Sequence, residues 1–196
     1  MLVSDLMTRE PVTITHDWKV KDAVILVAER KVSSLPVVDA QGRICGIVTE
    51  ADLIRDAFAH DVRAQELPHD DSARSPSLFI REVMSSPAVT VREHADLAEV
   101  VQLMTSARLK SLPVVDAEGH VVGVVSRSDV IRVRARTDGV IEDEVSAMLR
   151  SLEHEDWQVE VHDGIVEITG PDNPFDRSIA QVVANTVPGV IDVRVQ

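Results

Sequence analysis

The stretch Ser34-Leu35-Pro36-Val37-Val38-Asp39-Ala40 returns letter for letter at residues 111–117. The same offset of 77 residues, with no gap, relates further identical pairs on both sides: Met7 and Met84, Gly42 and Gly119, Gly46 and Gly123, and Asp52 and Asp129. Loop lengths therefore agree as well as core positions. Such agreement indicates that one folding unit is present twice.

Hydrophobic periodicity predicts the elements of each repeat. Apolar residues at helical spacing indicate one amphipathic helix per repeat: Val20, Ala23, Val24, Val27 and Ala28 in the first, and Leu97, Val100, Val101 and Met104 in the second. Residues 35–38 and 44–48 predict two strands joined by a type I turn. A second helix is expected to reach residue 60. Because two helices on so small a sheet bury little apolar surface, we expect the repeats to pack against each other.

The sequence divides into four segments. The repeats occupy residues 1–60 and 78–136. Residues 61–77 between them contain two prolines and a polar run, and they predict a solvated linker. From residue 140 the pattern changes, so residues 140–196 are expected to form a small domain of their own. The whole chain is expected to belong to the α/β (α+β) class.

Residues 140–196 predict the order helix, strand, strand, helix, strand. Asp163-Gly164 is a hairpin signal between two strands, and Asn173-Pro174 fits the start of the second helix. Three sets of apolar residues define the faces: Ile141, Val145, Met148, Leu149 and Leu152 on the first helix, Ile179, Val182, Val183 and Thr186 on the second, and Ile191, Val193 and Val195 on the last strand.

The repeated stretch, a turn with glycine, and then Gly46-Ile47-Val48-Thr49-Glu50-Ala51-Asp52 resemble the cystathionine beta-synthase (CBS) domain, and the tandem over residues 1–136 resembles a CBS pair. The resemblance implies clefts between the two units that hold an adenosine ligand. AMP, ADP or ATP is expected, with S-adenosylmethionine or NAD as alternatives, and no cofactor is required. The resemblance also implies a homodimer formed through the CBS units.

The resemblance carries the ribose-binding role to Thr49 with Asp52 and to Ser126 with Asp129. A carboxylate suits this role, because its oxygens accept hydrogen bonds from the 2′ and 3′ hydroxyls of a ribose. The same spacing, a hydroxyl residue followed three positions later by an acid, is also that of a helix capping box, which needs no ligand. The two interpretations are compatible.

The residues before each Leu-Pro are implied to face the acid of the other repeat. They are Val32 and Ser33 in the first repeat and Leu109 and Lys110 in the second. Lys110 supplies a cation for a phosphate, whereas Ser33 does not. We therefore expect the cleft with Asp52 and Lys110 to hold phosphates better than the cleft with Asp129 and Ser33. Lys110 is also consistent with an ordinary solvated lysine at a helix end.

Motifs for catalysis are missing from the sequence. The seven histidines are scattered, with neither a zinc-type His-Glu-x-x-His nor a Gly-x-Ser-x-Gly element. Cys45 is the single cysteine and lies in an apolar run, so we expect a packing role. His69-Asp70-Asp71 in the linker is interpreted as a solvated loop rather than a metal site. The chain is not expected to be an enzyme.

Charge and hydropathy exclude further classes. A net charge of −13 argues against a nucleic-acid partner, because phosphate backbones are held by dense Lys and Arg. The start of the sequence lacks the basic and apolar regions of a secretory signal. No run of about 18 apolar residues predicts a membrane-spanning helix. A cytoplasmic location is expected.

The C-terminal segment carries a second resemblance. Residues 163–170 and 187–193, with their glycines, resemble elements of the BON domain, a module associated with phospholipids and the cell envelope. Residues 140–196, however, contain 12 acidic residues and only three arginines, which gives a net charge of −9. Anionic membranes repel such a surface, so a protein-contact or intramolecular role is favoured. Two roles are open for the arginines just before the segment, which are Arg127, Arg132, Arg134 and Arg136. They could contact a ligand phosphate, or form exposed ion pairs with Glu142, Asp143 and Glu144, and the ion pairs are favoured.

Two functions remain open from the sequence. The favoured one is a regulatory, non-catalytic protein whose CBS pair binds an adenine nucleotide and whose BON-like domain relays or localises the signal. The alternative is a dimerising scaffold without nucleotide sensing, whose BON-like domain binds an envelope or phospholipid component or a partner protein.

Overall fold

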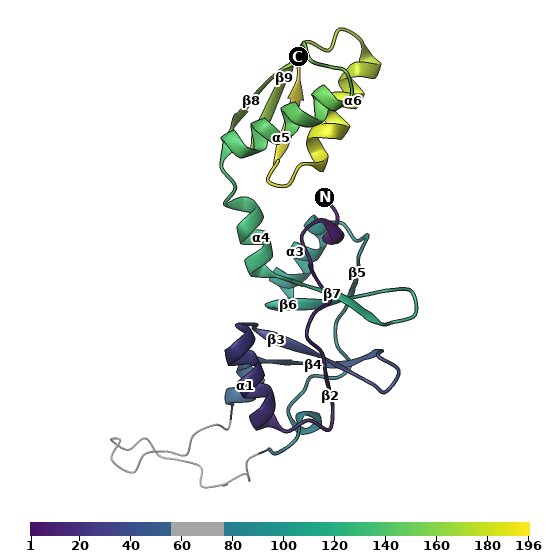
Figure 1. The fold of residues 1–196 in the computed structure, drawn as a ribbon, viewed down its shortest axis with the longest axis vertical. Helices are drawn as coiled ribbons and strands as arrows, with labels where there is room; N and C mark the ends of the chain where they lie inside the picture. The colour runs from purple at the N-terminus through teal and green to yellow at the C-terminus, as the bar shows by residue number, and fades with distance from the viewer. Residues whose placement is uncertain (56–76) are drawn as a thin grey trace, which may run out of the picture. The chain divides into compact units, whose positions relative to one another are not determined.

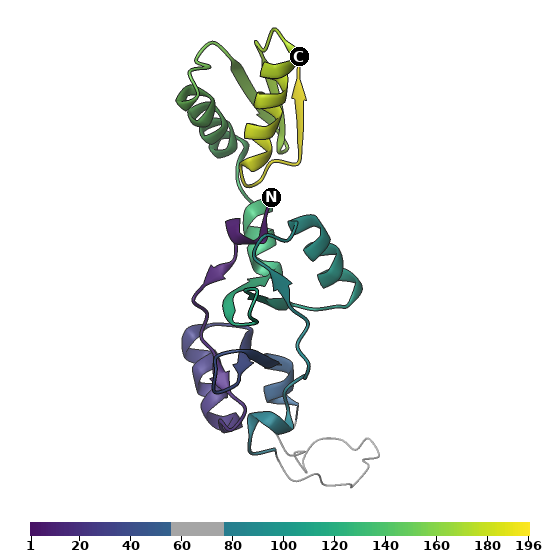
Figure 2. The same cartoon turned by 90° about the vertical axis from the view of Figure 1, so that its right-hand side faces the viewer.

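The computed structural model describes residues 1–55 and 77–196, and its elements are shown in Figures 1 and 2. The expected continuation of a helix to residue 60 and nearly all of the expected linker 61–77, with His69-Asp70-Asp71, lie outside the described residues. The chain forms two compact units. Met7–Glu93 and Ala107–Val125 make up the repeat-sheet unit, and the C-terminal unit comprises Met1–Leu6, His94–Ser106 and Ser126–Gln196. The mixed α+β class is confirmed.

The described residues of the repeat-sheet unit form two small sheets, each built mainly from the strands of one repeat. The first has the strand order β2 (Ile14–Thr15), β3 (Ser34–Val38), β4 (Ile44–Thr49), and α1 (Val20–Arg30) and α2 (Glu50–Ile54) accompany it. The second has the order β1 (Thr8–Arg9), β7 (Val121–Ser126), β6 (Ser111–Val115), β5 (Val91–Arg92). β3 and β4 pair antiparallel, as the predicted hairpin requires. Leu35, Val37 and Val48 are fully buried in the core of the first repeat.

The two repeats exchange short segments near their starts, so that each segment pairs with a strand of the other repeat. Thr8 pairs with Val124 on β7 of the second repeat, and the equivalent Ser85 pairs with Ile47 on β4 of the first. The exchange also explains the repeated glycines on β4 and β7. A Cβ on Gly123 would lie 2.6 Å from Met7 Sδ, and one on Gly46 would lie 2.9 Å from Met84 Sδ and 3.0 Å from the Ser85 carbonyl oxygen.

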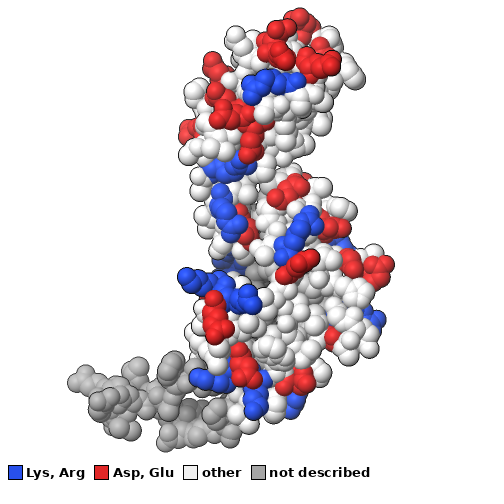
Figure 3. Space-filling model, in the orientation of Figure 1, with Lys and Arg blue, Asp and Glu red and all other residues white. Residues whose placement is uncertain are grey.

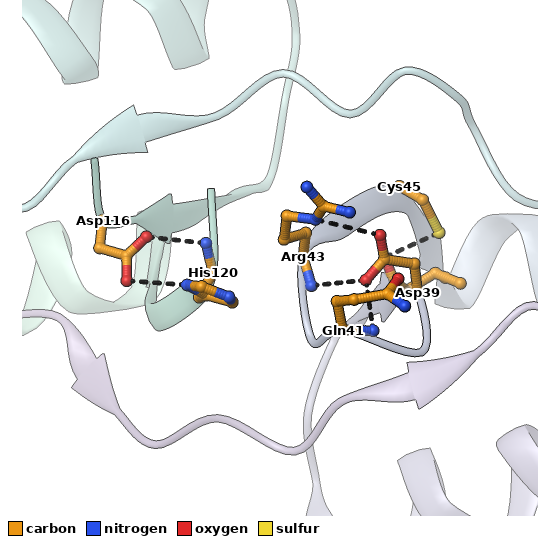
Figure 4. Close-up of polar contacts among 7 residues, drawn as sticks. Asp39, Gln41, Arg43, Cys45, Asp116 and His120 are labelled. Atoms are coloured by element: carbon orange, nitrogen blue, oxygen red, sulfur yellow. Dashed lines mark hydrogen bonds and ion pairs between the residues drawn. The ribbon is translucent and has the colours of Figure 1, made fainter. Parts of the chain in front are cut away.

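The two hairpin turns also meet each other within this unit (Figure 4). Arg43 and His120, which are equivalent positions, form an antiparallel bridge, and the Ile44 amide donates to the Gly119 carbonyl at 3.0 Å. The aspartate at the first position of each turn accepts hydrogen bonds at its Oδ1 from later backbone amides. Asp39 accepts from Gln41 and Arg43, and Asp116 accepts from Glu118 and His120. The expected packing of the repeats is thus confirmed for their sheets and turns.

The C-terminal unit contains α3 (Leu97–Ser106), α4 (Arg127–Arg134) and the whole C-terminal segment. That segment runs α5 (Asp138–Ser151), β8 (Gln158–His162), β9 (Ile165–Thr169), α6 (Pro174–Thr186), β10 (Asp192–Val195), and its strand order is β10-β9-β8. The predicted order is therefore confirmed. Asn173 caps α6 through its side chain, as its place before Pro174 predicts. The described residues also include two short 3-10 helices, Val3–Asp5 in this unit and Ile80–Glu82 in the repeat-sheet unit.

The predicted helix faces of the C-terminal segment are only partly correct. Ile141, Val145 and Leu149 are buried, but Met148 is 40% and Leu152 48% exposed. On α6 the buried residues are Ala180 and Ala184, and Val182 is 65% exposed. The prediction failed on α6 because it relied on large apolar residues, whereas two small alanines occupy the buried face of this helix.

Candidate functional site

Both expected capping boxes are present at the start of the helix after each hairpin. Thr49 is the N-cap of α2: its amide and hydroxyl donate to Asp52 Oδ2 at 3.0 and 2.7 Å, and the Asp52 amide donates to its hydroxyl at 3.4 Å. The Ser126 amide and hydroxyl donate to Asp129 Oδ2 at 2.8 and 2.6 Å in the same way. The capping interpretation is therefore confirmed for both acids.

Each capping acid is also bound by an arginine. Arg55 was not expected in this role, and Arg132 binds Asp129 here, whereas an ion pair with an acid of the C-terminal segment was favoured from the sequence. Arg55 Nη2 lies 2.8 Å from Asp52 Oδ1, and Arg132 Nη2 lies 2.9 Å from Asp129 Oδ1. The acids are buried, with side chains 9% and 5% exposed. Arg55 and Arg132 stand at the offset of 77, so the repeat itself held the signal for this contact.

A cavity of about 250 Å³ lies in the repeat-sheet unit and is lined by both repeats. Thr49 and Glu50 line it from the start of α2, Ser33 from the segment before β3, and Leu109 and Lys110 from the segment before β6. The structure thus brings Thr49 together with Leu109 and Lys110, which were expected in one cleft. It also places Ser33, which was expected in the other cleft, along the same cavity. The volume lies slightly below the range of about 300–1,000 Å³ that is typical of small-molecule sites.

The chemistry of the cavity wall is mixed. Apolar surface comes from Ile47, Ala88, Val89 and Leu109 and suits a flat base. The charged lining residues are two cations, Arg108 and Lys110, and one acid, Glu50. Arg108 and Glu50 were not expected as lining residues. Glu50 stands at a variable position between Thr49 and Asp52 of the motif, and Arg108 lies just before the expected pair Leu109 and Lys110.

Not every expected site residue lines this cavity. Asp52 is not itself a lining residue, but it is bound in the capping box to Thr49, which is one. Val32 packs, half-buried, against the core of the first repeat. Ser126 and Asp129 belong to the C-terminal unit, so their expected pairing with Ser33 stays a prediction.

Cys45 is half-buried rather than fully buried. Its thiol donates to the Val37 carbonyl at 3.3 Å, and burial raises the pKa of the thiol above its usual value. A raised pKa disfavours the reactive thiolate, which agrees with the expected packing role.

Metal binding and membrane crossing can be assessed for the described residues. They contain no group of three or more His, Cys, Asp or Glu side chains placed to hold a metal ion. Among the helices described, none combines the length and apolar character needed to cross a bilayer.

Comparison with known proteins identifies the family. The family model described as "CBS domain" matches residues 3–58 and 80–136. The chain belongs to the CBS domain family. It is 31% identical over 134 residues to a CBS domain-containing protein of Dictyostelium discoideum, covering 67% of this chain and 89% of that protein. It is 26% identical to the uncharacterized protein MJ1426 of Methanocaldococcus jannaschii, covering 67% of this chain and 89% of that protein.

Solved CBS structures share the fold of the repeated part. The CBS pair of protein MJ0100 in complex with 5′-methylthioadenosine and S-adenosyl-L-methionine has a TM-score of 0.56 at 25% identity, covering 68% of this chain and 94% of that one. CBSX2 in complex with AMP has a TM-score of 0.56 at 26% identity, covering 67% and 93%. The cytosolic domain of the Mg²⁺ channel MgtE in complex with ATP has a TM-score of 0.51 at 29% identity, covering 65% and 46%.

The family match ends at residue 136. The BON resemblance of residues 140–196 therefore rests on its sequence elements and on the observed element order, and it stays a prediction. The bounds of the four sequence segments likewise stay predictions.

Proposed function

We propose that this CBS protein is a regulatory, non-catalytic sensor that binds an adenine nucleotide in the cavity of the repeat-sheet unit. The observation that carries the proposal is the lining itself, in which Thr49 of one repeat and Leu109 and Lys110 of the other share one cavity. Three of the CBS structures similar to this chain are complexes with AMP, with ATP, or with S-adenosyl-L-methionine and 5′-methylthioadenosine. An adenosine ligand is the class they have in common.

The wall supports a role for each part of such a ligand. The apolar residues around Leu109 accept the base, Thr49 and the nearby Asp52 accept the ribose, and Lys110 with Arg108 attracts the phosphate. Two cations against one acid favour AMP, ADP or ATP over the positively charged sulfonium of S-adenosylmethionine.

The second cleft, with Ser126 and Asp129 and the residues Val32 and Ser33, belongs to the same proposal as the weaker phosphate site. A homodimer formed through the CBS units is also proposed. Ile54 and Ile131 occupy equivalent positions and are 61% and 67% exposed, which gives each repeat an apolar residue for such a contact. Light scattering of the parent and of Ile131→Glu tests it, with a lower mass expected for the variant.

Thermal-shift measurement with AMP, ADP, ATP, NAD and S-adenosylmethionine tests the ligand class. A ligand at 100 times its Kd stabilises the native state by about 2.7 kcal/mol. Calorimetric titration then compares Asp52→Asn with Asp129→Asn, and the first is expected to lose more AMP affinity. A flat thermal response to the whole panel would favour the scaffold function, in which the BON-like domain binds a partner without nucleotide sensing.

A further inference from the structure

The arginine that follows each candidate ribose acid has the same place in both repeats. Arg55 and Arg132 stand three residues after Asp52 and Asp129, and their Nη2 atoms bind the Oδ1 atoms at 2.8 and 2.9 Å. Two independent copies with one geometry indicate a feature of the repeat rather than a chance surface pair.

The acceptor positions of Asp52 are nearly all occupied. A carboxylate oxygen has about two acceptor positions. Oδ2 already accepts from both the amide and the hydroxyl of Thr49, and Oδ1 accepts from Arg55. One position therefore remains, whereas the 2′ and 3′ hydroxyls of a ribose offer two donors. To hold both hydroxyls, Asp52 has to release one of its present donors.

Exposure decides which donor can leave. The Thr49 bonds fix the start of α2, and the Asp52 side chain is 9% exposed. The Arg55 side chain is 66% exposed, so water replaces its ion pair easily. Exposed ion pairs contribute little to stability. Arg55 is the donor that costs least to displace.

We propose that Arg55 is a positioning residue that competes with the ribose 2′ and 3′ hydroxyls for Oδ1 of Asp52, so that nucleotide binding displaces Arg55 from the carboxylate. This inference rests on the proposed function. Arg55 then holds the carboxylate in place in the empty site and lowers the affinity for any ligand that carries the diol, which sets the nucleotide concentration at which the site fills.

The test compares two ligands that differ only in the diol. Calorimetric titration with AMP and with 2′,3′-dideoxyadenosine 5′-monophosphate is carried out on the full chain and on Arg55→Ala. AMP is expected to bind the variant about 1.5- to 5-fold more tightly, the range of an exposed ion pair, and the dideoxy ligand equally tightly. A merely structural role changes both affinities together. Arg55→Lys, which keeps a cation, is expected to lie close to the parent.

A further variant links the effect to the carboxylate. Arg55→Ala combined with Asp52→Asn is expected to lose the gain in AMP affinity. Unchanged or weaker AMP binding by folded Arg55→Ala, while the parent binds AMP, would overturn this inference alone. A parent chain that binds neither ligand would overturn the proposed function and the inference with it.

Discussion

Ser34 Oγ and Ser111 Oγ lie 2.6 Å apart and form a buried hydrogen bond. The two serines are the first residues of β3 and β6 and stand at equivalent positions of the repeats. This hydrogen bond therefore links the same position in both repeats. Ser34, the first residue of the repeated stretch, is thus hydrogen-bonded to its equivalent, Ser111. Identity of the two stretches at this position has a physical reason, since each hydroxyl satisfies the other.

This bond predicts a non-additive pair of substitutions. Ser34→Ala leaves the Ser111 hydroxyl buried without its partner and is expected to lower the free energy of unfolding by about 1–3 kcal/mol. The double variant Ser34→Ala/Ser111→Ala removes both groups and is expected to cost less than the sum of the single changes. Urea unfolding of the four proteins measures the coupling. Strictly additive losses would contradict it.

The exchanged segments predict the cost of a methyl group on β7. In Gly123→Ala the new Cβ would meet Met7 Sδ at 2.6 Å and the Thr8 carbonyl at 3.1 Å, so the pairing of β1 with β7 has to shift. A loss of about 1–3 kcal/mol is expected, as for other overpacked sites. Gly139→Ala is the control, because its Cβ meets nothing within 4 Å and alanine favours the helix α5. Equal melting temperatures for the two variants would rule out the close approach.

The turn of the first hairpin predicts a pH dependence. Hydrogen bonds from the Arg43 and Gln41 amides hold the pKa of Asp39 below its usual value of 3.8. Because the folded pKa is the lower one, the turn contributes its stability fully above the unfolded value and loses it as the pH falls through the folded value. An NMR titration of the Asp39 carboxyl carbon is expected to give a midpoint below 3.8. A midpoint at or above that value would refute the prediction.

The repeat made much of the fold predictable. Equivalent residues had to occupy equivalent places, so the pattern predicted for the hairpin and capping box of one repeat held for the other. The joint lining by Thr49 and Lys110 was implied by the CBS resemblance instead. The exchange of β1 was not predictable, because nothing in the spacing of Thr8 says which repeat it joins. Likewise, periodicity could not distinguish buried Ala184 from exposed Val182, since the size of the gap between two elements is a tertiary property.

The acidic C-terminal segment predicts a lack of membrane binding. Asp and Glu side chains gather on the face of this segment seen in Figure 3, and residues 140–196 carry a net charge of −9. Vesicles rich in anionic phospholipid repel such a surface. In co-sedimentation at physiological salt, the full chain is expected to stay in the supernatant. Salt-sensitive binding to these vesicles, absent with neutral ones, would instead favour the phospholipid role of the BON resemblance.

The side chain of Arg136, just after α4, contacts two parts of the C-terminal segment. Its Nη1 donates to the Pro188 carbonyl at 3.1 Å, and its Nη2 forms an ion pair with Glu144 of α5. The ion pair with Glu144 is one of those expected from the sequence. Here the arginine side chain is only 22% exposed, so the contacts are less screened than those of a surface pair.

Arg136→Ala is therefore expected to lower the free energy of unfolding by about 1–2 kcal/mol, toward the lower end of hydrogen bonds to charged groups. It should also speed hydrogen exchange at the amides of residues 189–191, which follow the carbonyl that loses its donor. Arg134→Ala, at an exposed position at the end of α4, is the control and should change neither quantity. Exchange rates at these amides that are the same in Arg136→Ala as in the parent would mean that Arg136 does not hold the segment in place.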